Sequence, residues 1–150
     1  MHVVAPIKMV GPATQTIDIA SNERPVTGSL VSRVKVATLG GIATSIMTTR
    51  CTVLSADGLD GLRLQVESTK PEDSTILQKL GPLGQIINES SPPFPSGDAL
   101  ERVAPGSSEI VMRTTYCDEG LRITRNDDMS NDDVFVWKRV KFGSDSTVSL

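Results

Sequence analysis

The stretch that decides the fold is Gly61-Leu62-Arg63-Leu64-Gln65-Val66-Glu67. Its apolar residues, Leu62, Leu64 and Val66, occupy every second position, and polar residues stand between them. Because successive side chains of a β-strand point to opposite faces of the sheet, this alternation predicts a strand with one buried and one solvated face.

The same alternation extends on both sides of this stretch. Further strands are predicted at residues 14–20, 30–39, 46–54, 109–117, 121–125 and 134–142. Turn-forming residues separate them at 22–25, 40–41, 57–61 and 126–133. Short turns between consecutive strands favour antiparallel pairing. The sequence therefore predicts an all-β or mainly β protein, an antiparallel meander that curls into a barrel or half-barrel.

The alternation stops between Thr69 and Glu109. Six prolines and several glycines fall in this segment. We expect a long irregular crossing loop here, with a short helical turn at residues 76–80, that caps one end of the barrel.

Composition limits the domain organisation and the class of function. The 150 residues suit one domain spanning residues 1–150, with 38% hydrophobic and 22% charged residues. A net charge of −3 and the lack of a basic run argue against a nucleic-acid partner. The sequence contains no apolar stretch long enough to cross a bilayer, and residues 1–6 lack the pattern of a targeting segment.

Residues for catalysis or metal binding are scarce. The one histidine is His2, so a catalytic base would stand at a terminus. The acidic stretch 126–133 lacks the glycine and the closing glutamate of a calcium loop, which favours a solvated turn. Cys51 and Cys117 are interpreted as buried thiols rather than a functional pair. We expect no enzyme activity, no cofactor and no metal.

The last third of the chain carries the candidate site. Residues 114–125 are predicted to form a strand, a tight acidic turn and a second strand. On the second strand, we expect Leu121 and Ile123 to line the interior, while Arg122 faces the other side with Thr124. Either Arg122 or Arg125 would then pair with Asp118 across the turn as a charge-assisted clasp.

Aromatic residues gather in the same region. They make up only 3% of the chain, yet Tyr116, Phe135 and Trp137 all lie near its end. Two readings stay open, ordinary core filling or the wall of a ligand site, to which Leu121 and Ile123 would contribute. Lys138, Arg139 and Lys141 form a basic patch that suits either anionic headgroups or a solvated strand edge.

The order Thr-Tyr-x-Asp-x-x-Leu-Arg-Ile-x-Arg, followed by a polar turn and Phe-Val-x-x-Arg, resembles the closing segment of the plastid lipid-associated proteins, or fibrillins. Residues 11–18 are similar to the family's strand that opens with a glutamine and an aspartate. The family motif falls on the following residues: Tyr116, Asp118, Leu121, Arg122, Ile123, Arg125, Phe135 and Arg139. The chain departs from the family at Cys117, usually a leucine, and in the longer acidic turn before Val134.

The resemblance implies a lipocalin-like barrel that binds carotenoids, quinones or neutral lipids in plastids, at plastoglobules and thylakoids. It implies a lipid or other apolar small molecule as partner, association with a plastoglobule or membrane surface, and no enzyme activity. The helical part that precedes the family's first strand is missing, so the chain resembles a short or truncated member.

The sequence is compatible with three functions. Binding of a lipid or isoprenoid leads, because burial of apolar ligand surface alone yields affinity. The alternative is a protein-interaction module that docks a partner through an open sheet edge or the proline-rich loop at residues 90–95. A small hydrolase or isomerase is the weakest reading, since the chain lacks a usable histidine.

Overall fold

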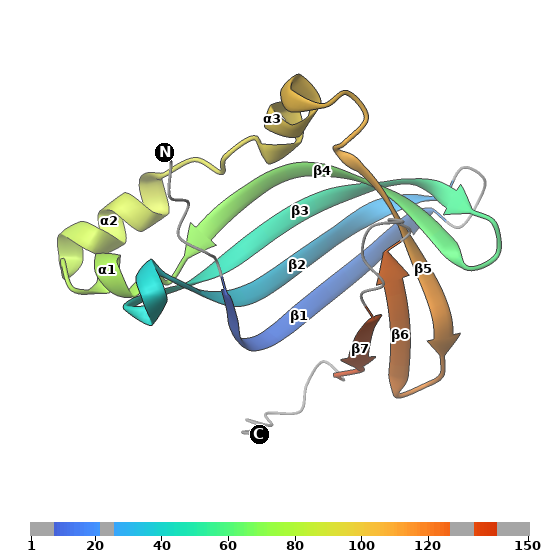
Figure 1. The fold of residues 1–150 in the computed structure, drawn as a ribbon, viewed down its shortest axis with the longest axis horizontal. Coiled ribbons are helices and arrows are strands. Elements are labelled where there is room, and N and C mark those ends of the chain that lie inside the picture. The colour runs from blue at the N-terminus through green and yellow to red at the C-terminus, as the bar shows by residue number, and fades with distance from the viewer. Residues whose placement is uncertain (1–7, 22–25, 127–133, 141–150) are drawn as a thin grey trace.

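A computed structural model describes residues 8–21, 26–126 and 134–140 of the chain, and strands dominate it (Figure 1). The strands are β1 Lys8–Ser21, β2 Thr27–Thr38, β3 Ala43–Asp57, β4 Gly61–Glu72, β5 Glu109–Cys117, β6 Leu121–Asn126 and β7 Val134–Lys138. The helices are the 3-10 turn η1 Leu39–Gly41 and the α-helices α1 Thr75–Gln78, α2 Pro82–Ser90 and α3 Ser96–Val103.

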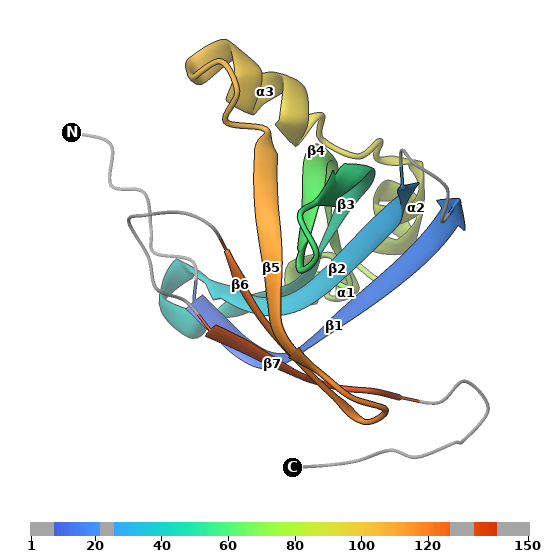
Figure 2. The same ribbon diagram turned by 90° about the vertical axis from the view of Figure 1, so that its right-hand side faces the viewer.

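The strands form one antiparallel sheet in the order β1-β2-β3-β4-β5-β6-β7, in which each strand pairs with its neighbours in sequence. The sheet curls strongly into a half-barrel, so that β5, β6 and β7 turn back toward β1 (Figure 2). This confirms the mainly β meander. The predicted strand at residues 134–142 extends too far at its C-terminal end, because β7 ends at Lys138 and Arg139 and Val140 lie outside the strand.

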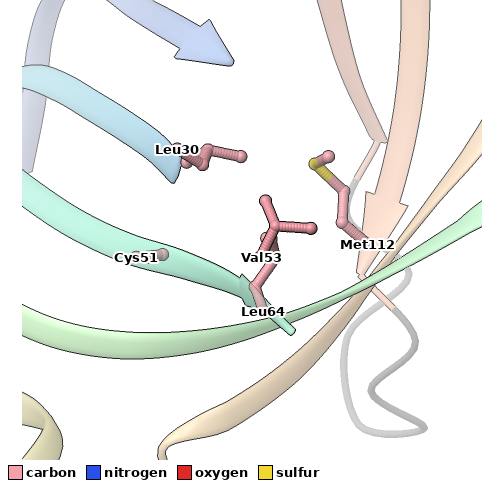
Figure 3. Close-up of a cluster of buried hydrophobic side chains, with 5 residues drawn as sticks. All are labelled: Leu30, Cys51, Val53, Leu64 and Met112. Carbon is pink, nitrogen blue, oxygen red and sulfur yellow. The ribbon is translucent and has the colours of Figure 1, made fainter. Parts of the chain in front are cut away.

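The hydrophobic core lies on the concave side of the sheet. Leu30, Val53 and Met112 come from β2, β3 and β5, and their side chains point toward one another (Figure 3). Leu64 of the deciding stretch belongs to the same cluster and is 1% exposed. Burial of each such side chain contributes about 1.5–3 kcal/mol. The alternation at residues 62–66 therefore places its apolar residues as predicted.

The irregular crossing between β4 and β5 was predicted wrongly. Strand β4 continues to Glu72, and three α-helices follow where only one helical turn was expected. Proline misled the prediction, because its missing N–H is harmless in the first turn of a helix. Pro82 is the first residue of α2, and Pro95 immediately precedes α3.

The crossing runs back along the edge of β4. Thr69 and Phe94 exchange two backbone hydrogen bonds of 2.9 Å, and α3 packs against β4. The approach is close at Gly97, where a Cβ atom would lie 2.0 Å from the carbonyl oxygen of Val66. Helices α1 and α2 lie at the end of the sheet where β4 ends (Figure 1). The proline-rich loop is thus already a pairing partner of β4.

Candidate ligand-binding face

Two distant strands meet across the concave side through Gln15 and Arg122. Gln15 lies on β1 and Arg122 on β6, and the Arg122 guanidinium donates a hydrogen bond to Gln15 Oε1. Gln15 Nε2 lies 3.9 Å from the Sδ atom of the core residue Met112. Because the sheet curls, side chains of its first and sixth strands can touch only on the concave side. Arg122 therefore faces the interior.

The aromatic residues of β7 lie beside Arg122. Phe135 and Trp137 stack with ring centroids 6.2 Å apart, and the Arg122 guanidinium carbon is 6.0 Å from the Trp137 ring centroid. Trp137 Nε1 donates a 2.9 Å hydrogen bond to Oγ1 of Thr124, which is 1% exposed. The concave side of β6 and β7 thus combines aromatic rings, a cation and a buried hydroxyl.

The predicted orientation of β6 is wrong. Its interior side carries Arg122 and Thr124, and Leu121 and Ile123 point to the convex side. The pattern misled because it treats polar residues as solvated. Thr124 is buried only because the Trp137 indole satisfies its hydroxyl, and hydrogen bonding offsets the cost of burying a polar group.

The predicted ligand-binding set is therefore divided between two faces. Ile123 is the backbone partner of Tyr116 on β5 and of Val136 on β7, so these side chains lie on the same face. This is the convex face, which also carries Leu121. Phe135 and Trp137 lie on the concave face. The five residues do not form one wall.

The clasp at Asp118 also differs from the prediction. The carboxylate accepts hydrogen bonds from the Tyr116 hydroxyl at 2.8 Å and from the N–H groups of Gly120 and Leu121 at 2.7 and 2.6 Å. Arg122 is directed to Gln15 instead, and Arg125 lies at the opposite end of β6, across from Arg113. A tyrosine and two backbone amides thus fix this turn.

These hydrogen bonds change the acidity of both side chains. The Gly120 N–H, the Tyr116 hydroxyl and the Leu121 N–H lower the pKa of the Asp118 carboxyl below its ordinary value. The hydrogen bond to Asp118 and the charge of its carboxylate raise the pKa of the Tyr116 hydroxyl. Both groups are exposed, and their arrangement is that of a turn rather than of a catalytic pair.

Other predicted features lie at the margins of the described residues. The Arg139 N–H donates a 2.8 Å hydrogen bond to the Gly120 carbonyl, so the Arg139 backbone also stabilises the turn at Asp118. Three predicted features lie outside the described residues: His2, Lys141 and the acidic residues 127–133, which make up most of the predicted solvated turn.

A row of half-buried apolar side chains continues the concave face across β1 to β4. Ile17, Val34, Met47 and Leu62 are all partly exposed there. The described helices lie at one end of the sheet and along the edge of β4, so they leave the middle of this face uncovered (Figures 1 and 2). We define Ile17, Val34, Met47, Leu62, Phe135 and Trp137 as the concave apolar row.

A separate open hollow of about 450 Å³ lies at the turn end of β1, β2 and β3. Its lining includes Asp18, Ser29 and Thr52, which lie on the convex side of neighbouring strands, together with apolar residues such as Val53 and Leu54. None of the predicted site residues lines this hollow. The surface of this hollow is mainly apolar and open to solvent, and the hollow shares no residue with the concave apolar row.

The sequence pattern did not identify Gln15 and Met112 as residues of the candidate site. Gln15 alternates with Ala13 and Ile17 on the inward side of β1, and a polar residue in an apolar row was the available signal. Its partner Arg122 lies 107 residues away, a separation that strand periodicity cannot bridge.

Searches against models of protein families, curated proteins and solved structures returned no match to this chain. No helix among the described residues has the length and apolar character needed to cross a bilayer. The described residues also contain no cluster of three or more histidine, cysteine or acidic side chains suited to a metal ion. The function is therefore inferred from the residues of the concave face.

Proposed function

We propose that this protein is a non-enzymatic binding protein that holds a lipid or isoprenoid against the concave apolar row. The observation that carries the proposal is the row itself: six half-buried apolar side chains on one curved face that the described helices leave uncovered. An apolar ligand would remove these side chains from water at about 25 cal/mol per Å². The resemblance to plastid lipid-associated proteins supports a carotenoid, quinone or neutral lipid, and a plastid location.

The single tryptophan gives a direct test. Trp137 is the only tryptophan of the chain and lies on the concave apolar row. A bound quinone or carotenoid should quench its fluorescence in a saturable way. We would titrate the purified chain with a short-chain quinone, and we would extract the untreated protein with solvent to identify any co-purified ligand by native mass spectrometry.

A matched pair of variants ties the quenching to the concave face. Met47→Gln places an amide in the row at nearly constant volume, and we expect about tenfold weaker quinone binding. Val136→Asn introduces a similar amide on the convex side, where Val136 is 64% exposed, and should leave binding unchanged. A cooperatively folded chain that takes up neither quinone, carotenoid nor long-chain lipid would overturn the proposal.

A specific observation also favours the second candidate, a protein-interaction module. Leu83, Ile86 and Ile87 are spaced along one face of α2, and all three are exposed. Helix α2 packs against α1, which in turn contacts β3. An amphipathic helix with an unpaired apolar face is a common mode of partner docking. Replacing Ile86 with Ser would weaken such docking and leave quinone binding intact, which separates the two functions.

A further inference from the structure

The concave face contains a polar spot with several hydrogen-bond donors, at Arg122 and Gln15. Arg122 has several N–H donors, and among the described residues it forms a hydrogen bond to Gln15 Oε1 and a ring contact with Trp137. Among the described residues, no Asp or Glu forms an ion pair with Arg122. The positive charge therefore faces the interior without a described counter-charge.

Gln15 adds donors to the same spot. Its Oε1 accepts a hydrogen bond from Arg122, while the partner of its Nε2 among the described residues is the Met112 sulfur at 3.9 Å. A thioether is a weak acceptor, so this N–H₂ group keeps most of its capacity to donate. Two neighbouring side chains from β1 and β6 thus present donors toward the concave side.

Arg122 is also held in place and partly removed from water. Its guanidinium donates a hydrogen bond to Gln15 and lies over the Trp137 ring, 6.0 Å from the ring centroid. Burial lowers the pKa of the Arg122 guanidinium, but an arginine remains charged near neutral pH. A fixed guanidinium in a partly dry site binds an anion more strongly than a solvated one.

We propose that Arg122 and Gln15 form a head-group subsite for the carboxylate of a fatty acid, whose hydrocarbon tail lies along the concave apolar row. The inference rests on the proposed function and narrows its ligand class. The guanidinium fork matches the two oxygens of a carboxylate, Gln15 Nε2 donates beside it, and Phe135 and Trp137 contact the first carbons of the tail.

The test compares two ligands of equal chain length, decanoate and decan-1-ol, by titration calorimetry. The protein should bind decanoate more tightly than the alcohol. In Arg122→Gln, decanoate affinity should fall about tenfold or more, toward that of decan-1-ol, while affinity for the alcohol changes little. Arg122→Lys keeps the charge but loses the fork, so it should retain part of the preference.

Arg50→Gln is the matched control, because it removes the same charge from an exposed position on the convex side of β3. It should leave both affinities unchanged. Circular dichroism of each variant checks that the sheet persists, and Arg122→Lys remains informative if Arg122→Gln does not fold.

The outcomes separate the subsite from the binding function. Equal binding of decanoate and decan-1-ol by the unmodified protein, unaffected by Arg122→Gln, would overturn the head-group subsite and leave the apolar binding proposal intact. Equal loss of both ligands in Arg122→Gln would also overturn it, in favour of a neutral oxygen acceptor such as a quinone carbonyl. If neither ligand binds and quinone fails as well, the proposed function itself is wrong.

Discussion

Arg122 on β6 donates a hydrogen bond to the side-chain oxygen of Gln15 on β1, across 107 residues of sequence. The sheet order places β1 and β7 at opposite ends, so within the described part of the chain no backbone ladder joins β1 to β5, β6 or β7. This side-chain contact instead links the two ends of the half-barrel across its concave side. Its removal should lower the free energy of unfolding modestly without breaking any strand pair.

We expect Gln15→Ala and Arg122→Ala to be energetically coupled. Each variant should lower the free energy of unfolding, and the double variant should lose less than the sum, with a coupling of about 1 kcal/mol. Urea denaturation of the four proteins in the cycle measures this coupling. Gln85→Ala, on the exposed surface of α2, serves as the control and should change stability little. Additive effects of the two single variants would contradict a direct interaction.

The core should be sensitive at Leu64 and insensitive at Leu59. Leu64 is 1% exposed in the concave cluster, whereas Leu59 in the β3–β4 turn is 105% exposed. Leu64→Ala should therefore lower the free energy of unfolding by about 2–5 kcal/mol through lost burial and a residual cavity. Leu59→Ala should leave it nearly unchanged. Thermal unfolding followed by circular dichroism compares the two, and similar melting temperatures would argue against this core.

The turn at Asp118 should be visible in the titration of Tyr116, the only tyrosine of the chain. We expect the pKa of Tyr116 to lie above its ordinary value of 10.0, since the Asp118 carboxylate accepts its hydrogen bond. Ultraviolet absorbance of the tyrosinate against pH measures it directly. Asp118→Asn removes the charge, so the pKa should fall back toward 10.0.

The sign of the effect on stability follows from the same shifts. Because the folded pKa of Tyr116 is raised, its contribution is complete below its unfolded pKa near 10.0 and is lost as pH rises through the folded value. The pKa of Asp118 is lowered, so its contribution is present above its unfolded pKa near 3.8 and is lost as pH falls through the folded value. A tyrosine titration identical in the native and urea-unfolded protein would refute the contact.

The two cysteines should react at very different rates. Cys51 is buried in the core as expected, but Cys117 is exposed, so the interpretation of both cysteines as buried thiols is wrong for Cys117. Burial, with the charge of Glu67, raises the pKa of the Cys51 thiol to about 11. An aromatic disulfide reagent at neutral pH should therefore label one thiol promptly in the folded protein and both in urea. Cys117→Ser should abolish the prompt reaction. Prompt labelling that persists in this variant would show that Cys51 is accessible.

The strand pattern and its antiparallel order were predictable because both depend on neighbouring residues. Alternation at residues 62–66 marks the buried face of β4. The short turns between consecutive strands favour antiparallel pairing of each strand with the next. The helices of the crossing were not predictable in the same way, because proline can either interrupt a helix or stand at its start. Pro82 and Pro95 stand at the starts of α2 and α3.

The candidate site was only half predictable. The sequence marked Arg122, Phe135 and Trp137 as residues of interest, but it assigned Arg122 to the wrong side of β6 and to the wrong partner. A local pattern treats a buried threonine or arginine as solvated, because the partners that satisfy it lie elsewhere in the chain. Thr124 is buried under Trp137, and the partner of Arg122 comes from β1.

The sequence by itself thus determined the class of fold, the strand order and the inward residues of β4, all of which follow from side-chain alternation and turn chemistry over a few residues. Only the tertiary structure decided which face of β6 is interior, that Tyr116 rather than an arginine closes the Asp118 turn, and that Gln15 meets Arg122. The physical reason is the curl of the sheet. Curvature brings the ends of the strand order together, and no local pattern encodes the contacts that form there.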